Sequence, residues 1–517
     1  MPRCYRLCAD VISAPFFPIL TGATSCVTFL RTIRTGSAFT VTLTHSPDSL
    51  DIVSGALSHL SHRARTLDTG PLEEPALHIF SHLAAPPDAV TSHRRSLPAY
   101  QAATLVLAVE AYADDRPEES TSSAAQRWSS VRGHERYHDD LVAMLSSCRR
   151  GGSCRGAPVE YRSVDVGPAS TMSVPVFGLL DTHSPGGIPV AVALHIPDPA
   201  HQAPLQIEVL SGDRDAGAST LDALLSLMTD HDVMRGQVLT LGGSGGRGNG
   251  LVRFMARPTV AGEDLILPDG TLEAMTRHLV TVGSSAARLR EAGQHVGRGL
   301  LLYGPPGTGK THTVRHLLGL VPMSTVIVLT GSAMRHIAEA TTLARRLSPS
   351  VVVVEDVDLI AREREETGVN SLLFALLDAM DGMDGDADVT FVLTTNRPDS
   401  IERAVRDRPG RIDLAVEIPL PDTRGRERLA RLYLSAVNVA ADLTPLVEAT
   451  EGGTASYVRE LVRRTVVAAI ERDDHGADGH TTVITDDDVA AVLTACVDER
   501  QRLTRSLLGG SGVRPAG

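Results

Sequence analysis

The sequence has little lysine, few aromatic residues and no cysteines spaced as in common metal sites. Lysine and arginine together number 49 among 517 residues, and Lys310 is the one lysine. Aromatic residues make up 3% of the chain, which leaves little material for stacking nucleic-acid bases. The 62 acidic residues outnumber the basic ones and give a net charge of −13. This charge disfavours non-specific electrostatic binding to nucleic acid, so the sequence carries no strong signal for nucleic-acid binding.

The six cysteines form no CxxC motif, and the pair in CRRGGSC has the wrong spacing for the common zinc patterns. Scattered cysteines of this kind are typical of reduced thiols, so we expect a cytoplasmic protein. The apolar stretch 11–30 is interrupted by Pro15 and Pro18, and Asp10 precedes it. These features argue against a signal peptide or a membrane segment.

The texture of the chain changes along its length and predicts five regions. They are a poorly structured N-terminal extension (1–95), an α+β N-terminal domain for partner recognition (96–258), a parallel α/β subdomain (262–422), a helical lid (423–500) and a flexible tail (501–517). The N-terminal domain is inferred from a helical pattern at 99–113 followed by short strand-like runs. The last two runs, QVLTL and LVRFM, flank GGSGGRGNG, which we interpret as a hairpin loop because no helix follows it.

GPPGTGKT fits the phosphate-binding pattern G-x-x-x-x-G-K-[ST]. It follows the apolar run GLLLY and precedes a helical pattern, which is the context that this motif requires. Lys310 is expected to reach the β and γ phosphates of a nucleotide, and the Thr311 hydroxyl to ligate Mg²⁺. The motif therefore predicts ATP and Mg²⁺ binding by Gly304, Pro305, Pro306, Gly307, Thr308, Gly309, Lys310 and Thr311.

Polar residues follow two further strand-like runs, where a parallel sheet presents its ligand site. In SVVVVEDVD, Glu355 is expected to hold the Mg²⁺ through water, and Asp356 to orient and polarise the attacking water. Asn396, at the end of VTFVLTTN, can hydrogen-bond both the γ-phosphate and that water. In RDRPGRID, the guanidinium of Arg408 or Arg411 can neutralise charge in phosphoryl transfer, an effect worth about 10³–10⁵ in rate.

The succession of these motifs resembles the AAA subgroup of AAA+ ATPases over about residues 262–500. The resemblance implies a P-loop parallel-sheet module (the large ATPase subdomain, 262–422) with a small helical lid. It also implies a hexameric ring with ATP bound between subunits. The matches are Lys310 and Thr311 in Walker A, Glu355 and Asp356 in Walker B, Asn396 as sensor 1, and Arg408 and Arg411 as arginine fingers that act on the neighbouring subunit's ATP.

Two features depart from most of that subgroup. The Walker B acids are reversed. If roles follow position, the resemblance makes Asp356 the general base, on a side chain one methylene shorter than the usual glutamate. The loop that carries an aromatic residue in substrate-threading relatives is short here, and Met334 to Ile337 occupy its place. Both departures are similar to the Rieske-protein translocase branch of mitochondrial AAA proteins.

The sequence therefore predicts a Mg²⁺-dependent ATPase that remodels a protein partner as a ring. A slowly hydrolysing, ATP-dependent assembly switch or scaffold remains the main alternative, because of the reversed acids and the missing aromatic. A nucleic-acid motor is a third, less favoured hypothesis. The partner and the oligomer number stay open.

Overall fold

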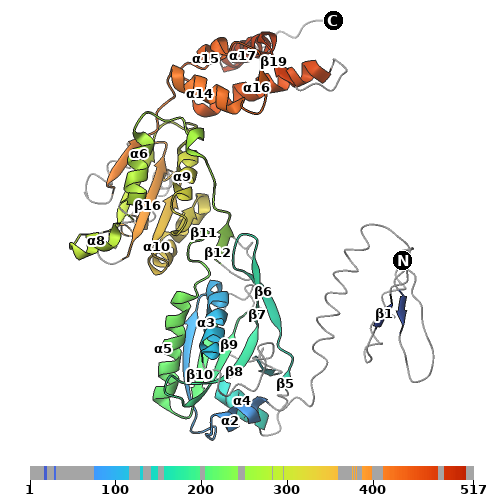
Figure 1. Ribbon diagram of the computed structural model, residues 1–517, viewed down its shortest axis with the longest axis vertical. Coiled ribbons are helices and arrows are strands. Elements are labelled where there is room, and N and C mark those ends of the chain that lie inside the picture. Colours follow the sequence, from blue (N-terminus) through green and yellow to red (C-terminus); the bar gives the residue numbers. More distant parts are fainter. Residues whose placement is uncertain are drawn as a thin grey trace.

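The computed structural model describes the chain in segments, and all structural statements below concern them. These are 17–19, 28–30, 75–115, 128–131, 141–149, 156–197, 204–242, 251–281, 283, 285–294, 296–358, 375–376, 378, 380, 387–398, 412–474 and 482–507. Three parts follow one another along the long axis of the molecule: an N-terminal domain, a seven-stranded sheet with its helices, and a helical lid (Figure 1).

The N-terminal domain is built on a four-stranded antiparallel sheet of order β3-β10-β9-β8. The strands are β3 (Thr91–Leu97), β8 (Phe177–His183), β9 (Pro189–His195) and β10 (Leu205–Ser211). One face packs against α3 (Ala102–Asp114) and α5 (Arg214–Asp230), and the other against α2 (Pro75–His82) and α4 (Leu141–Arg149). Apolar side chains alternate along the strands, so each face has its own core.

Smaller paired strands complete the N-terminal half. They are β1 (Phe17–Ile19) with β2 (Thr28–Leu30), β4 (Ser130–Val131) with β5 (Gly156–Ala157), and β6 (Tyr161–Asp165) with β7 (Thr171–Pro175). The sequence predicts a poorly structured extension up to residue 95, and this boundary is placed too late. Helix α2 and most of β3 lie before it and belong to the folded domain, because polar residues on β3 hid its pairing with β10.

The seven-stranded sheet has the order β12-β11-β14-β15-β16-β13-β17. Its strands are β11 (Val238–Leu241), β12 (Val252–Met255), β13 (Arg298–Tyr303), β14 (Thr325–Leu329), β15 (Ser350–Val354), β16 (Val389–Thr395) and β17 (Leu414–Glu417). Six strands run parallel, and β12 is antiparallel to β11. The predicted parallel α/β module is confirmed.

Helices cover both faces of this sheet. Helix α10 (Ile337–Arg346) and the turn η7 (Gly331–His336) pack on one face. Helices α6 (Thr271–Thr276) and α9 (Lys310–Gly319), with the π-helical turn η6 (Arg277–Thr281), pack on the other. The central strand β15 is buried along its whole length, as its run of four valines predicts.

Strands β11 and β12 correct one prediction. The sequence assigns both to the N-terminal domain, but β11 pairs with β14 and extends the seven-stranded sheet at its edge. Their apolar side chains, including Leu239 and Phe254, join the core under α10. A strand pattern predicts a buried face and not the sheet that buries it, which explains the error. The two strands do form an antiparallel hairpin around the glycine-rich loop, as predicted.

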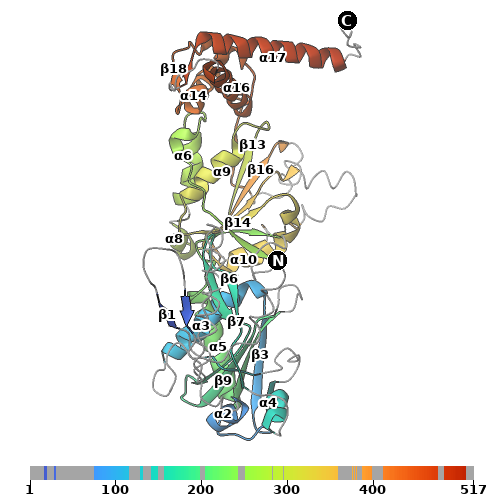
Figure 2. The same cartoon turned by 90° about the vertical axis from the view of Figure 1, so that its right-hand side faces the viewer.

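The lid follows the last strand of the sheet and is helical, as predicted (Figure 2). It contains α14 (Thr423–Tyr433), α15 (Thr444–Ala449), α16 (Ala455–Asp474) and α17 (Asp486–Leu507), with a short parallel pair, β18 (Asn438–Val439) and β19 (Val483–Ile484). Helix α17 continues through Leu507, so the predicted tail from 501 begins too early. No helix in the described segments is long and apolar enough to cross a membrane.

Candidate active site

The predicted phosphate loop connects β13 to α9 at the carboxyl edge of the sheet. Gly304 has a φ of 144°, and a Cβ added there would lie 2.2 Å from the carbonyl oxygen of Ile418. Gly307 has a φ of 79°, and a Cβ there would lie 3.0 Å from the Ser456 hydroxyl of the lid. Glycine is therefore required at both positions, because φ is positive and because other segments of the protein lie too close for a Cβ.

Lys310 opens helix α9 and is 6% exposed. Its Nζ donates hydrogen bonds to the carbonyl oxygens of Gly304 and Pro305, each over 2.8 Å. Burial lowers the pKa of this ammonium, whereas the negative charges of Asp356 and Asp358 raise it. The ammonium is thus held within the loop by backbone carbonyls that phosphate oxygens can replace.

The two predicted acids follow β15 and have different surroundings. Glu355 is half-buried and hydrogen-bonded to Thr311. Burial and the nearby charge of Asp356 raise its pKa, and the bond to Thr311 opposes this shift. Asp356 is exposed and has a φ of 53°. The shorter acid therefore stands at the open surface of the site, and the longer one lies beside the phosphate loop.

Asn396 follows β16, the strand next to β15 in the sheet. Its Nδ2 donates a hydrogen bond to Oδ1 of Asp356 over 3.1 Å. The predicted sensor and the predicted general base are thus in direct contact. Lys310 also lies close enough to Asp356 for the carboxylate to act on its pKa. The structure therefore brings the residues predicted from three separate strands together at one sheet edge.

The residues predicted to bind Mg²⁺ fit that ion. The Thr311 hydroxyl and the Glu355 carboxylate are hydrogen-bonded neighbours, and hard oxygen ligands are those that Mg²⁺ prefers. In the described segments, no three or more His, Cys, Asp or Glu side chains gather into a metal-binding cluster. A pair of oxygen ligands suits an ion that keeps several waters and takes its other ligands from substrate phosphates.

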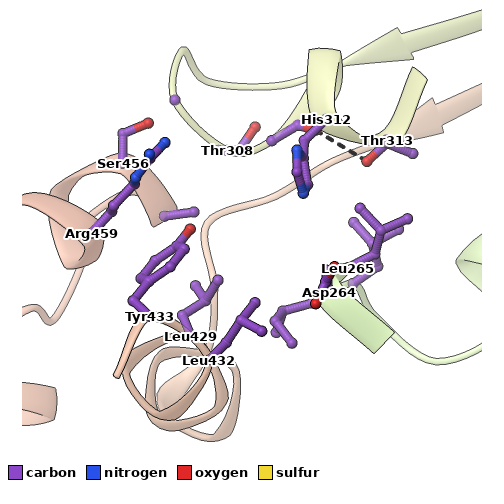
Figure 3. Close-up of a pocket in the computed structure, with 15 residues that line it drawn as sticks. Asp264, Leu265, Thr308, His312, Thr313, Leu429, Leu432, Tyr433, Ser456 and Arg459 are labelled. Carbon is purple, nitrogen blue, oxygen red and sulfur yellow. Dashed lines mark hydrogen bonds between the residues drawn. The ribbon is translucent and has the colours of Figure 1, made fainter. Parts of the chain in front are cut away.

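A cavity of about 380 Å³ lies beside the phosphate loop, between the sheet module and the lid (Figure 3). The loop contributes Gly307, Thr308 and Gly309, and the segment 264–267 contributes a mainly apolar wall. The lid closes the other side and is tied to the loop by the Ser456 amide, which donates to the Gly307 carbonyl oxygen over 3.0 Å. The size and the mixed lining suit a nucleotide base and sugar.

Several polar side chains that line this cavity were not predicted from the sequence. Among them are His312 from α9, Tyr433 from α14 and Arg459 from α16, which point into the cavity in Figure 3. Burial lowers the pKa of His312, and the charge of Arg315 and of Arg459 lowers it further. Burial raises the pKa of the Tyr433 hydroxyl, against the charge of Arg459. Strand-end patterns locate the phosphate site. Tyr433 and Arg459 reach the cavity only through the lid fold, and His312 lies on the helix that follows the phosphate loop.

Two further predictions concern the arginine fingers and the loop that carries an aromatic residue in substrate-threading relatives. The predicted arginine fingers, Arg408 and Arg411, lie outside the described residues. The place of the aromatic loop is described: it is the turn η7, in which Met334 is 4% exposed and packs into the core under α10. Its apolar side chain points inward, so the exposed side chains of this turn are polar, such as Arg335.

Comparison with known proteins gives an independent result. A model of the ATPase family associated with various cellular activities (AAA) matches residues 300–420. The proteasome-activating nucleotidase of Thermococcus kodakarensis is 30% identical over 270 residues, which are 48% of this chain and 65% of that protein. The one from Methanoculleus marisnigri is 36% identical over 194 residues, which are 34% of this chain and 47% of that protein.

Protein SAV of Sulfolobus acidocaldarius is 33% identical over 235 residues, which are 42% of this chain and 30% of that protein. The chain thus spans less than two thirds of each of these relatives. The matched region contains the phosphate loop, the acid pair and Asn396, and the strands that position them run parallel, as predicted. The sequence match, the parallel sheet and the phosphate-loop site agree that this chain contains a domain of the AAA family over residues 300–420.

Proposed function

We propose that this protein binds ATP together with Mg²⁺, hydrolyses it, and uses the cycle to remodel a protein partner as an oligomeric, hexameric ring. The observation that carries the proposal is the convergence of Lys310, Glu355, Asp356 and Asn396 at one edge of the sheet, beside a nucleotide-sized cavity. Groups held in place before the substrate arrives stabilise a transition state without reorganisation.

Each residue has a distinct task in this proposal. The loop amides and Lys310 hold the phosphates of ATP, and Thr311 and Glu355 hold the Mg²⁺. When bound, that ion neutralises charge on the phosphates. Asp356 accepts a proton from the attacking water as general base, and Asn396 orients that water. Arg408 and Arg411 would act on the ATP of the neighbouring subunit, so hydrolysis depends on assembly.

Phosphate release from ATP tests this function. Purified protein with Mg²⁺ is expected to hydrolyse ATP at a modest rate, and Lys310→Ala is expected to abolish this. Arg411→Ala is expected to lower turnover by about 10³-fold or more while ATP binding is retained, because the finger acts only in the transition state. Wild-type turnover no faster than that of Lys310→Ala would contradict the proposal.

A second candidate is an assembly switch that binds ATP, forms a ring or scaffold, and hydrolyses slowly. Two observations favour it: the base is an aspartate, and the turn η7 presents no aromatic side chain for gripping a chain. The same assay separates the two candidates. A motor loses most of its turnover in Arg411→Ala, whereas a switch has little turnover to lose and assembles with ATP in either form.

The partner is proposed to be a protein in the cytoplasm. Two of the relatives are named proteasome-activating nucleotidases, and this name describes nucleotidases that act on a protein assembly. Their names support a protein partner for this chain. The antiparallel sheet domain is proposed to recognise the partner. Crosslinking in cells that express Asp356→Asn, which is expected to retain ATP and stall, would identify it by mass spectrometry. Crosslinks confined to nucleic acid would instead support the nucleic-acid motor.

A further inference from the structure

Asp356 has an unusual backbone conformation. Among the non-glycine residues that the structure describes, it and Ala84 have a positive φ, and that of Asp356 is 53°. Such a conformation is disfavoured for side chains with a Cβ, although aspartate tolerates it better than most. It persists only where surrounding contacts hold it, and residues of this kind cluster at active sites.

Strand β16 supplies the contacts that hold this conformation. The backbone amide of Asp356 donates a hydrogen bond to the Oγ1 of Thr394 over 3.0 Å. The next amide, that of Val357, donates to the Thr394 carbonyl oxygen over 2.9 Å. Thr394 is 1% exposed, so its hydroxyl meets the loop in a buried place. A single residue of β16 therefore accepts hydrogen bonds from two successive backbone amides, those of Asp356 and Val357.

Asp358, four residues after the end of β15, makes the reciprocal contacts to the end of β16. One oxygen of its carboxylate, Oδ1, accepts from the Thr395 hydroxyl over 3.2 Å and from the Asn396 amide over 3.1 Å. Asp358 is 5% exposed, which keeps these bonds away from water. A buried carboxylate bonded in this way fixes the backbone from which the Asn396 side chain reaches Asp356.

These contacts form a frame around a carboxylate that is one methylene shorter than the glutamate usual at this position. We propose that Thr394 and Asp358 are positioning residues: they hold Asp356 in its left-handed conformation against Asn396, and this conformation lets an aspartate serve as general base. This inference rests on the proposed ATPase function. It explains how the reversed acid pair is compatible with hydrolysis, since the turned backbone and not a longer side chain presents the carboxylate.

The first test removes the two holding groups. Thr394→Val keeps the shape of the side chain and removes the acceptor, and Asp358→Ala removes the other. Each is expected to lower kcat about 10- to 100-fold with the KM for ATP within twofold, because a misplaced base slows chemistry more than binding. Asp358→Asn keeps an oxygen acceptor at the same place, and is expected to turn over at least tenfold faster than Asp358→Ala.

Thr390→Val is the matched control, since it makes the same change at the opposite end of β16, where the strand pairs with Arg298 and Val351. It is expected to keep wild-type turnover. Equal turnover in Thr394→Val and Thr390→Val would overturn the proposal. So would an Asp358→Ala variant whose KM rises while kcat is unchanged.

The second test restores the usual order of the acids. Asp356→Glu, alone or with Glu355→Asp, is expected to be at least tenfold slower than wild type, because a glutamate fits the left-handed conformation poorly and overreaches Asn396. A simple lack of side-chain length predicts the opposite result. Turnover equal to or faster than wild type would therefore overturn the proposal.

A third readout does not depend on hydrolysis. In nucleotide-free protein, hydrogen exchange of a peptide covering 350–358 is expected to quicken in Thr394→Val and not in Thr390→Val. If the wild type hydrolysed no ATP, the proposed function would fail. The exchange rates would then still decide whether Thr394 holds the loop, and equal exchange in the two variants would show that it does not.

Discussion

The two edges of the seven-stranded sheet handle charge in opposite ways. At the amino edge, Arg298 at the start of β13 is paired with Asp388, which immediately precedes β16, and both are buried. At the carboxyl edge of the same two strands, the Lys310 ammonium is hydrogen-bonded to backbone carbonyls of the phosphate loop, and the Asn396 side chain donates to the exposed Asp356. At the amino edge the charged side chains pair with each other. At the carboxyl edge they remain available to bind a ligand.

Burial accounts for the difference. The closed pair is surrounded by further protein contacts, such as the Ser348 hydroxyl that accepts from the Asp388 amide over 3.0 Å. Burial lowers the pKa of Arg298 and raises that of Asp388, and each charge opposes the shift of the other. Such a pair is stable only while both partners are present. A catalytic edge has the reverse requirement, because its groups must exchange protein partners for a substrate.

The amino edge gives the largest expected effect. Arg298→Met leaves the Asp388 carboxylate buried without its partner, and is expected to destabilise the ATPase domain by about 3–5 kcal/mol. Thermal unfolding with and without ADP identifies the transition of that domain, because only this transition shifts with the nucleotide. The double variant Arg298→Met/Asp388→Leu is the control and is expected to recover most of the loss. If the single variant were as stable as the double variant, the closed pair would have no structural role.

The carboxyl edge gives the next largest effect. Lys310→Arg preserves the charge, but a planar guanidinium is too bulky for the position between the Gly304 and Pro305 carbonyls. Turnover is expected to fall about 10²–10³-fold, as for the loss of one preorganised donor. The reverse exchange at an exposed position of the lid, Arg428→Lys, is expected to change nothing. Phosphate release measures both, and an active Lys310→Arg would remove the structural reason for the one lysine of the chain.

The edges also differ in how far the sequence predicts them. The phosphate loop, the acid pair and Asn396 follow apolar strand patterns, so the rule that parallel strands present ligands at their carboxyl ends is enough to gather them. The pair of Arg298 and Asp388 has no such signal. The two residues are 90 positions apart, and each alone resembles an ordinary charged residue at a strand end.

The other features that the sequence did not predict have a common physical cause. The pairing of β11 with β14, the inclusion of β3 in the N-terminal sheet and the frame formed by Thr394 and Asp358 all depend on which strand lies beside which. Periodicity reports the buried face of an element and not its neighbour. The positive φ of Asp356 belongs to the same class, because a contact from another strand sustains it.

The smallest expected effect tests whether the lid takes part in the carboxyl edge. Arg459 lies on α16 at the cavity, and its charge lowers the pKa of His312 across it. Arg459→Ala is expected to weaken ATP binding about tenfold, because an exposed guanidinium gains only part of a full charged hydrogen bond to the nucleotide. Arg463→Ala is the matched control one turn further along α16, where the side chain is paired with Glu460 and lies outside the cavity. Titration with a fluorescent ATP analogue measures both affinities. Equal binding by the two variants would confine the charged part of the nucleotide site to the sheet edge and leave the lid with uncharged contacts alone.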